Sequence, residues 1–257
     1  MTARQRVLFD DHRTQMPAIE RLIDHDRFEV AFAPFDEGTD FAAFDLVVPL
    51  RIDQISPARA ANADGRRRAV LPDDDTIEVC DDKLLFHERL EALGFGELLP
   101  AVLGEGDRRY PHVLKARRGD WGQGIRILRS PADEPEIVPP DSFREAAVEG
   151  ADEYVLHLLR VDGQVRYRLC YRYDMGAGLT VRGAVDAPRA IEPADDAPAL
   201  APCLAILEAL GFEGTCCFNY KLVDGRPIIL ELNPRFGGSL VGDITNYVAA
   251  HLAALGQ

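Results

Sequence analysis

Residues 214–239, GTCCFNYKLVDGRPIILELNPRFGGS, form two apolar runs on either side of a short Val-Asp-Gly-Arg turn. This pattern predicts a β-hairpin. Period-2 alternation along the second run puts Ile229, Glu231 and Asn233 on one face of the strand. A carboxylate and an amide oxygen on one face of an apolar strand are hard oxygen donors of the kind that Mg²⁺ prefers. The alternative is an edge hairpin with a solvated Glu231, but the flanking Ile-Ile-Leu favours burial.

The register of this hairpin decides which residue lies opposite Glu231. A two-residue loop at 224–225 would place Phe218 there. A three-residue loop would place Asn219 there instead. A metal site needs the polar Asn219, so the metal hypothesis predicts the three-residue loop.

A second polar position lies in the apolar strand HVLKA, residues 112–116. Burying the Lys115 ammonium without a partner would be costly, so an anionic group should meet it. The segment GDWGQG at 119–124 follows, and its glycines would let backbone N–H groups approach a phosphate. We therefore expect a phosphate site here, although a tight hairpin with a lysine that reaches the surface is the alternative. A Walker A motif is absent.

Arginines near these motifs are candidates for binding phosphate. Arg235 follows the hairpin at once and could neutralise charge on a transferring phosphoryl group. Arg182 is the preferred candidate among the arginines in or near the central strands. For any single arginine, a salt bridge with the acidic excess is the alternative.

The rest of the chain alternates helices and strands around these motifs. Strands at 6–9, 28–33 and 44–50, with a helix near 17–25, predict a small parallel α/β unit. Beyond it we expect a helix at 81–96, strands on both sides of 119–124 and of 162–163, a surface loop at 186–198, and helices at 199–212 and 246–255.

Composition excludes several classes of protein. The 257 residues are 47% hydrophobic and 28% charged, and no apolar run approaches the length of a membrane helix. The net charge of −14 disfavours nucleic acid or an anionic membrane as the main partner. Five cysteines without CxxC spacing predict reduced, packed thiols. The N-terminus lacks a signal peptide's apolar core, so we expect a cytoplasmic protein.

Known catalytic motifs of other classes are absent from the sequence. There is no HExxH or HxxxH pattern to hold a catalytic zinc and no GxSxG nucleophile. No GxGxxG follows the first predicted strand, so a dinucleotide site there is not expected.

Four segments taken in order resemble the ATP-grasp superfamily: DDK at 81–83, VLKARRGDWGQGI at 113–125, EYVLHLLRVDG at 153–163, and the hairpin at 214–239. The ELNPRFGG ending looks most like the carbamoyl-phosphate-synthetase-like branch. The resemblance implies an α/β (α+β) fold in which a small N-terminal parallel α/β subdomain precedes two α+β subdomains, whose antiparallel sheets sandwich ATP. Members of this family join a carboxylate to an amine through an acyl phosphate, using Mg-ATP.

The resemblance also implies roles for individual residues. Those matching the family's catalytic positions are Lys115, Arg182 and Arg235. Those matching its nucleotide contacts are Lys83, Lys115, Gly119, Gly122, Gly124, Glu153, His157, Leu158, Leu159 and Val161, where 157–161 would cradle adenine. Those matching its metal ligands are Asn219, Glu231 and Asn233.

Two positions depart from the family pattern. Val165 stands near where many members have an acidic residue that binds the ribose, so sugar recognition must come from elsewhere, with Glu153 or the backbone as candidates. Asn219 replaces the commoner Asp or Gln, which keeps an oxygen ligand.

Together these features predict three parts: an N-terminal unit at 1–78, a central lid at 79–155 and a C-terminal part with the metal site at 156–257. We expect an ADP-forming carbon–nitrogen ligase that uses ATP with Mg²⁺ or Mn²⁺. Its partners would be a small-molecule carboxylate and an amine, without nucleic acid or membrane, and the sequence is compatible with a homodimer. The alternatives are a small-molecule kinase on the same fold and an ATP-binding module without turnover.

Overall fold

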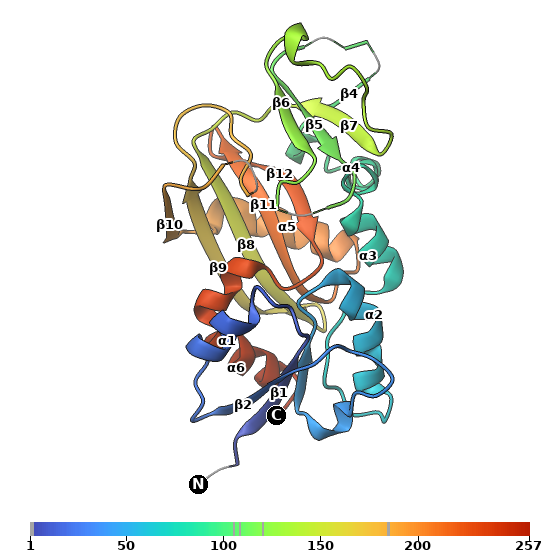
Figure 1. Cartoon of the computed structure of the whole chain (residues 1–257), viewed down its shortest axis with the longest axis vertical. Helices are drawn as coiled ribbons and strands as arrows, with labels where there is room; N and C mark the ends of the chain where they lie inside the picture. Colours follow the sequence, from blue (N-terminus) through green and yellow to red (C-terminus); the bar gives the residue numbers. More distant parts are fainter. Residues whose placement is uncertain (1–2, 105, 108, 120, 184–185) are drawn as a thin grey trace.

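Three sheets follow one another along the long axis of the molecule (Figure 1). The computed structural model describes residues 3–104, 106–107, 109–119, 121–183 and 186–257. The mixed α/β class with one parallel and two antiparallel sheets confirms the predicted fold class. None of the described helices is long and apolar enough to cross a bilayer.

The N-terminal unit is a parallel sheet in the order β2-β1-β3. Val7 and Phe9 of β1 pack in one apolar cluster and Leu8 packs in another, so both faces of this central strand are covered. The elements of the unit are β1 (Gln5–Phe9), α1 (Met16–Leu22), β2 (Phe28–Phe32), β3 (Leu46–Val48), α2 (Ile55–Ala58) and the 3-10 turns η1 (Phe41–Ala43), η2 (Ile52–Gln54) and η3 (Arg59–Asn62).

A four-stranded antiparallel sheet in the order β4-β7-β5-β6 lies at the opposite end of the molecule (Figure 1). Two helices lead into it, and Asp73 and Asp82 cap their N-termini. The elements are α3 (Asp74–Asp81), α4 (Lys83–Ala92), η4 (Gly96–Leu98), β4 (Val102–Leu103), β5 (His112–Ala116), β6 (Ile125–Leu128), η5 (Pro131–Asp133) and β7 (Ser142–Ala146).

A five-stranded antiparallel sheet in the order β10-β9-β8-β11-β12 occupies the middle. Its elements are β8 (Asp152–Val161), β9 (Gln164–Asp174), β10 (Ala190–Pro193), α5 (Ala197–Ala209), β11 (Gly214–Val223), β12 (Arg226–Asn233), η6 (Gly238–Asp243) and α6 (Ile244–Ala254). The predicted surface loop at 186–198 is wrong in part, because β10 pairs with β9. Its Pro193 is tolerated because β10 is an edge strand.

The N-terminal unit and the five-stranded sheet share one apolar core. Val7 and Phe9 of β1 pack in the same cluster as Leu159 of β8 and Tyr247 of α6. The predicted boundaries at 78/79 and 155/156 fall inside α3 and β8. The three-part division therefore stays a prediction, and the parts meet in continuous elements.

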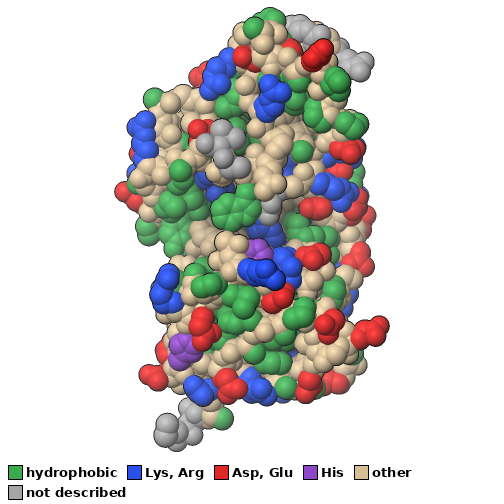
Figure 2. Space-filling model, in the orientation of Figure 1, with side chains coloured by type: hydrophobic (Ala, Val, Ile, Leu, Met, Phe, Trp, Pro, Cys, Tyr) green, Lys and Arg blue, Asp and Glu red, His purple; other side chains and the backbone are tan. Residues whose placement is uncertain are grey.

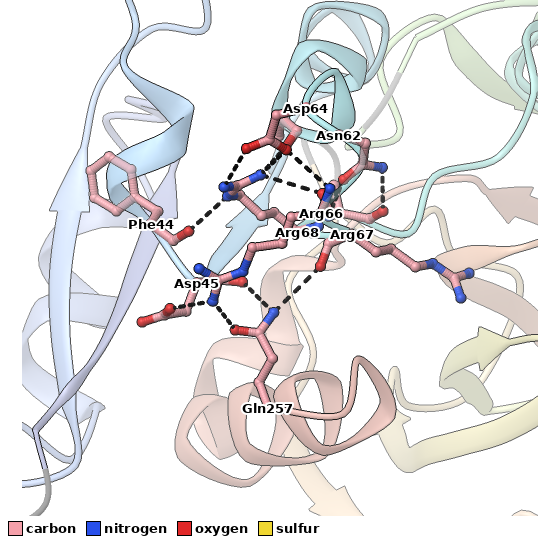
Figure 3. A network of polar contacts seen from close by, with 10 residues as sticks. Phe44, Asp45, Asn62, Asp64, Arg66, Arg67, Arg68 and Gln257 are labelled. Carbon is pink, nitrogen blue, oxygen red and sulfur yellow. Dashed lines mark hydrogen bonds and ion pairs between the residues drawn. The ribbon is translucent and has the colours of Figure 1, made fainter.

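An arginine cluster fastens the C-terminus to the N-terminal unit (Figure 3). One Arg66 nitrogen donates to the Asp45 carboxylate and to the Gln257 side chain, both at 2.7 Å. The Gln257 amide in turn donates to the Asp45 carbonyl at 3.0 Å. The neighbouring Arg68 is buried and binds both oxygens of Asp64, which lowers the pKa of that carboxyl to about 2. The arginines of the basic run at 66–68 therefore stabilise the fold through contacts within the chain.

His251 of α6 is expected to make folding sensitive to mild acid. Burial lowers the pKa of its imidazole to about 3, and its Nδ1 lies 3.2 Å from the Tyr247 hydroxyl. The unfolded chain binds a proton near pH 6.5, so the free energy of unfolding should fall as the pH drops from about 6.5 toward 3. We expect His251→Asn to reduce the slope of the free energy of unfolding against pH, by up to the contribution of one bound proton. Urea unfolding at several pH values measures it, and the exposed His25→Asn serves as the control; an unchanged slope in His251→Asn would contradict the prediction.

Candidate functional site

A cavity of about 530 Å³ lies between the four-stranded and five-stranded sheets. This volume is typical of small-molecule sites. Its floor consists of alternate residues of β8 and β11, because side chains at every second position of a strand share a face. The floor residues are Glu153, Val155 and His157 on β8 and Cys217, Asn219 and Lys221 on β11.

The hairpin of β11 and β12 places Asn219 opposite Glu231 by an unexpected route. The predicted three-residue loop is wrong: Val223 pairs with Arg226, which leaves a two-residue turn. Its residues have φ of 50° and 76°, as in the type I′ turns that favour Asp-Gly. A β-bulge then shifts the register between Asn219 and Tyr220, so that Glu231 meets Asn219.

The same bulge corrects the predicted face of Ile229. Leu230 is the extra residue of β12, so alternation breaks there. Ile229 therefore packs in the core with Leu232, while Leu230 and Glu231 both line the cavity.

Glu231 is the centre of a polar group. Its Oε1 accepts the amides of Asn219 at 2.7 Å and Asn233 at 3.0 Å, and Lys83 Nζ lies 3.7 Å from Oε2. Burial by itself would raise the pKa of Glu231. The opposite effect is larger and holds the pKa below its usual value; it comes from the charge of Lys83, the hydrogen bond from the Asn233 amide, and the charges of Lys115 and Arg182. Glu231 is therefore a carboxylate at neutral pH.

The donor set of Glu231, Asn219 and Asn233 fits a hard cation. One carboxylate and two amide oxygens match Mg²⁺, which binds through few protein oxygens together with substrate phosphates. Rotation of each amide by 180° would present oxygen in place of nitrogen. Over the described part of the chain, three or more His, Cys, Asp or Glu nowhere gather into a metal-type cluster.

Both predicted phosphate-binding lysines line the cavity, and each already has a carboxylate partner. Lys83 opens α4 and donates to the Gly119 carbonyl at 2.6 Å in addition to its contact with Glu231. Lys115 on β5 lies 2.6 Å from the Glu145 carboxylate on β7 and 3.3 Å from the Leu230 carbonyl. The expected anion at Lys115 is thus a residue of this chain.

The glycine-rich segment packs closely against the backbone near Arg182 and against Ala116 of β5. A Cβ at Gly122 would come within 2.7 Å of the Arg182 carbonyl, and one at Gly124 within 2.8 Å of Ala116. Gly119 and Gly122 line the cavity, whereas Gly124 shapes the turn. Between them, Trp121 has φ of 55° and also lines the cavity, and Asp120 lies outside the described residues. Figure 2 shows hydrophobic and basic side chains gathered in the hollow between the two upper sheets.

Arg182 and Arg235 approach the cavity from two sides. Arg182 Nε donates to the Glu153 carboxylate at 2.6 Å, and the guanidinium carbon of Arg182 lies over the Tyr173 ring, 4.4 Å from its centroid. Arg235 Nη2 donates to the Asn233 side-chain oxygen at 3.4 Å. Both guanidinium groups therefore lie beside the Glu231 group, where negative charge would be bound.

His157 lies at the far end of the floor and is neutral. Burial, followed by the charges of Arg182 and Arg235, lowers its pKa to about 3. Its Nε2 lies 2.7 Å from the Ser239 hydroxyl. It can orient Ser239, but it does not supply a cation.

Gly237 leaves room for this imidazole. A Cβ at Gly237 would lie 2.4 Å from His157 Cε1, whereas one at Gly238 would meet nothing closer than 3.8 Å. Gly237→Ala should therefore destabilise the fold by about 1–3 kcal/mol, and Gly238→Ala should be nearly neutral. Urea unfolding of the pair tests this expectation, and equal midpoints would contradict it.

Three residues predicted to cradle adenine do not reach the cavity. Leu158 faces the core beneath the sheet, and Leu159 and Val161 pack against the N-terminal unit. The structure instead offers an apolar slot on the lid side, lined by Val113, Ile125, Ile127, Val148 and Leu179.

Sequence reasoning also missed the polar residues Glu145 and Lys221, which line the cavity. A signal for Glu145 was present: the chain needed an anion for Lys115, and FREAAV at 143–148 offers a carboxylate within an apolar run. Lys221 alternates with Asn219 on β11, and the period of two puts both on one face.

Several solved structures resemble this one. An L-amino acid ligase from Bacillus licheniformis superposes with a TM-score of 0.63 at 19% identity, over 94% of this chain and 70% of that one. The D-alanine–D-alanine ligase of Bacillus anthracis complexed with ATP gives 0.62 at 14% identity, over 99% and 95%. N5-carboxyaminoimidazole ribonucleotide synthetase from Thermotoga maritima gives 0.59 at 16% identity, over 96% and 75%.

No protein-family model and no curated protein sequence matches the chain. The similarity is therefore one of structure. In each of the three pairs it covers nearly all of this protein's chain. It brings together the same features that the sequence motifs suggested: a parallel N-terminal unit and two antiparallel sheets around a cavity. The chain therefore has the ATP-grasp fold, which these structural neighbours share.

Proposed function

We propose that this protein is an ATP-dependent, ADP-forming ligase that joins a carboxylate to an amine. The observation that carries the proposal is the convergence of Lys83, Lys115 and Arg235 with the Glu231 group in one cavity between two antiparallel sheets. Such a site suits a nucleotide triphosphate with its counter-ion at one end and its base in the apolar slot. Two structural neighbours support this reading: the D-alanine–D-alanine ligase complexed with ATP, and an N5-carboxyaminoimidazole ribonucleotide synthetase in complex with ADP.

In the first step, a substrate carboxylate oxygen attacks the γ-phosphorus, and the bond to the β-phosphate oxygen breaks. Lys115, Arg182 and Arg235 neutralise charge on the transferring phosphoryl group. Asn219, Glu231 and Asn233 would hold Mg²⁺, or Mn²⁺, which neutralises the nucleotide phosphates when bound. ADP leaves, and the acyl phosphate remains.

In the second step, the amine attacks the acyl carbon, loses a proton, and phosphate departs with the bonding electrons. Gly119, Gly122 and Gly124 would let the segment at 119–124 cover the phosphates, which limits hydrolysis by water. The side of the cavity near His157 and Ser239, away from the apolar slot, is the place we assign to the acid and the amine.

The test is ADP release screened over paired carboxylates and amines, with mass detection of the products. A coupled product that appears only when acid and amine are both present supports ligation. ADP with a stable phosphorylated product and no need for an amine would indicate the kinase alternative. Tight ATP binding without ADP release across the panel would indicate a module without turnover.

A further inference from the structure

Gln15 is a buried residue of the cavity for which the proposed reaction has no role. It is 7% exposed and lines the cavity from the N-terminal unit. Among the described residues, its side-chain oxygen has no hydrogen-bond partner. A buried amide oxygen is costly to leave unpaired, so a ligand that hydrogen-bonds to this amide would be favoured.

The helix that follows Gln15 does not account for its side chain. Gln15 is the N-cap of α1, a position that favours Ser, Thr, Asp and Asn because their side chains accept from the first turn. The Gln15 side chain makes no such hydrogen bond. Its Nε2 lies 3.8 Å from the position that a Cβ of Gly238 would take. A half-turn of the amide exchanges its nitrogen and oxygen, so either atom can face a ligand there.

Trp121 approaches the same point from the glycine-rich segment. Its Cζ2 lies 3.9 Å from the position of a Gly238 Cβ, and it is the only tryptophan in the chain. Carbon atoms attract each other best at about 3.5–4.0 Å, so a ligand carbon at this point would contact both the indole and the Gln15 amide. The indole and the amide together limit how large a group can lie against Gly238.

The acid of the proposed ligation is the substrate that suits this point. Arg235, which we place beside the transferring phosphoryl group, precedes Gly238 by three residues, and both line the cavity. An acid whose carboxylate faces that phosphoryl group can therefore extend its chain along 236–238. The cavity of about 530 Å³ has the volume of a site for one small molecule, and it must hold the nucleotide as well. The acid must therefore be small.

We propose that Gln15, Trp121 and Gly238 form the subsite for the acid, and that they select a short carboxylic acid that carries a hydroxyl or amino group. The indole covers the carbon chain against Gly238, and the Gln15 amide binds the polar group. The inference rests on the proposed ligase function and adds the residues that choose the acid.

The test measures kcat/KM for ADP release, with hydroxylamine as the amine and with propanoate, hexanoate, lactate, alanine and β-alanine as acids. The native protein should favour a substituted acid over propanoate, and propanoate over hexanoate. Gln15→Met should reduce the first preference by about 10-fold or more, because the hydrogen bond is lost. Trp121→Ala should raise the use of hexanoate relative to propanoate, and Gly238→Val should lower it.

Gln164→Met and Ile137→Ala are the matched controls, because both residues are exposed and lie outside the cavity lining. Both should keep the native ratios between acids. Gly238 does not have a positive φ, so Gly238→Val tests the space beside Gln15 and Trp121 and not the backbone.

The ratios between acids separate a contact with the acid from a general loss of activity. An equal loss for every acid in Gln15→Met and Trp121→Ala would overturn the proposal. A native protein that uses all the acids equally overturns it without any variant, so a variant that fails to fold does not protect it.

The emission of Trp121 gives a second measurement on the native protein. In the presence of AMP-PNP, a non-hydrolysable ATP analogue, the preferred acid should change this emission. Turnover of that acid without a change defeats the subsite alone. A change without ADP release supports the subsite and defeats the ligase function, whereas a native protein that shows neither defeats both.

Discussion

Glu231→Gln is expected to abolish Mg²⁺-dependent nucleotide binding and to lower ADP release by roughly 100-fold or more. Glu231 is the single carboxylate of its donor set, and glutamine keeps the shape while it removes the charge. Lys83, 3.7 Å away, would also lose its counter-charge. Titration of ATP with Mg²⁺ and with EDTA measures the binding, and the ADP assay measures turnover.

The exposed Glu97→Gln is the control for this change, because Glu97 lies in η4 and outside the cavity lining. It should keep native binding. Wild-type affinity for Mg-ATP in Glu231→Gln would show that the Asn219, Glu231 and Asn233 set does not hold the cation. Lost affinity with an unchanged unfolding midpoint would place the effect in the site and not in the fold.

Lys115→Met is expected to cost about 3–5 kcal/mol in the free energy of unfolding as well as activity. Lys115 and Glu145 have side-chain exposures of 7% and 5%, and their atoms lie 2.6 Å apart. Removing the ammonium would leave the Glu145 charge buried without its partner. Urea unfolding and the ADP assay together separate the two losses.

The double variant Lys115→Met/Glu145→Gln distinguishes charge burial from packing. Removing both charges should recover most of the stability, because neither group is then left uncompensated. Activity should stay lost, since the phosphoryl group would still lack Lys115. A double variant no more stable than Lys115→Met would contradict the assigned cause.

Local patterns in the sequence were sufficient to locate most elements of the site. The Asp-Gly turns at 162–163 and 224–225 carry the positive φ values that two-residue hairpins require. The apolar runs beside them fold as β8, β9, β11 and β12. Turn chemistry and strand alternation act over a few residues, so one sequence can reveal them.

Three of the residues predicted to cradle adenine lie outside the cavity, because alternation does not mark where a cavity ends. His157 and Leu159 share one face of β8, but the strand continues beneath the N-terminal unit after His157. Leu158 points to the opposite face, into the core with α5. Only the packing of residues more than 100 positions apart separates the cavity from the core along this strand.

The sequence by itself determined that an apolar hairpin would carry Glu231 and Asn233, that Lys115 would need an anion, and that glycines would follow it. These conclusions rest on burial cost and on a period of two, which are local properties. The tertiary structure decided that a bulge at Leu230 brings Asn219 to Glu231, and that Glu145 is the anion. It also decided that Lys221 faces the cavity between Glu153 and Val148. The physical reason is that register shifts and contacts between sheets depend on how distant segments pack, and no short window of sequence contains that information.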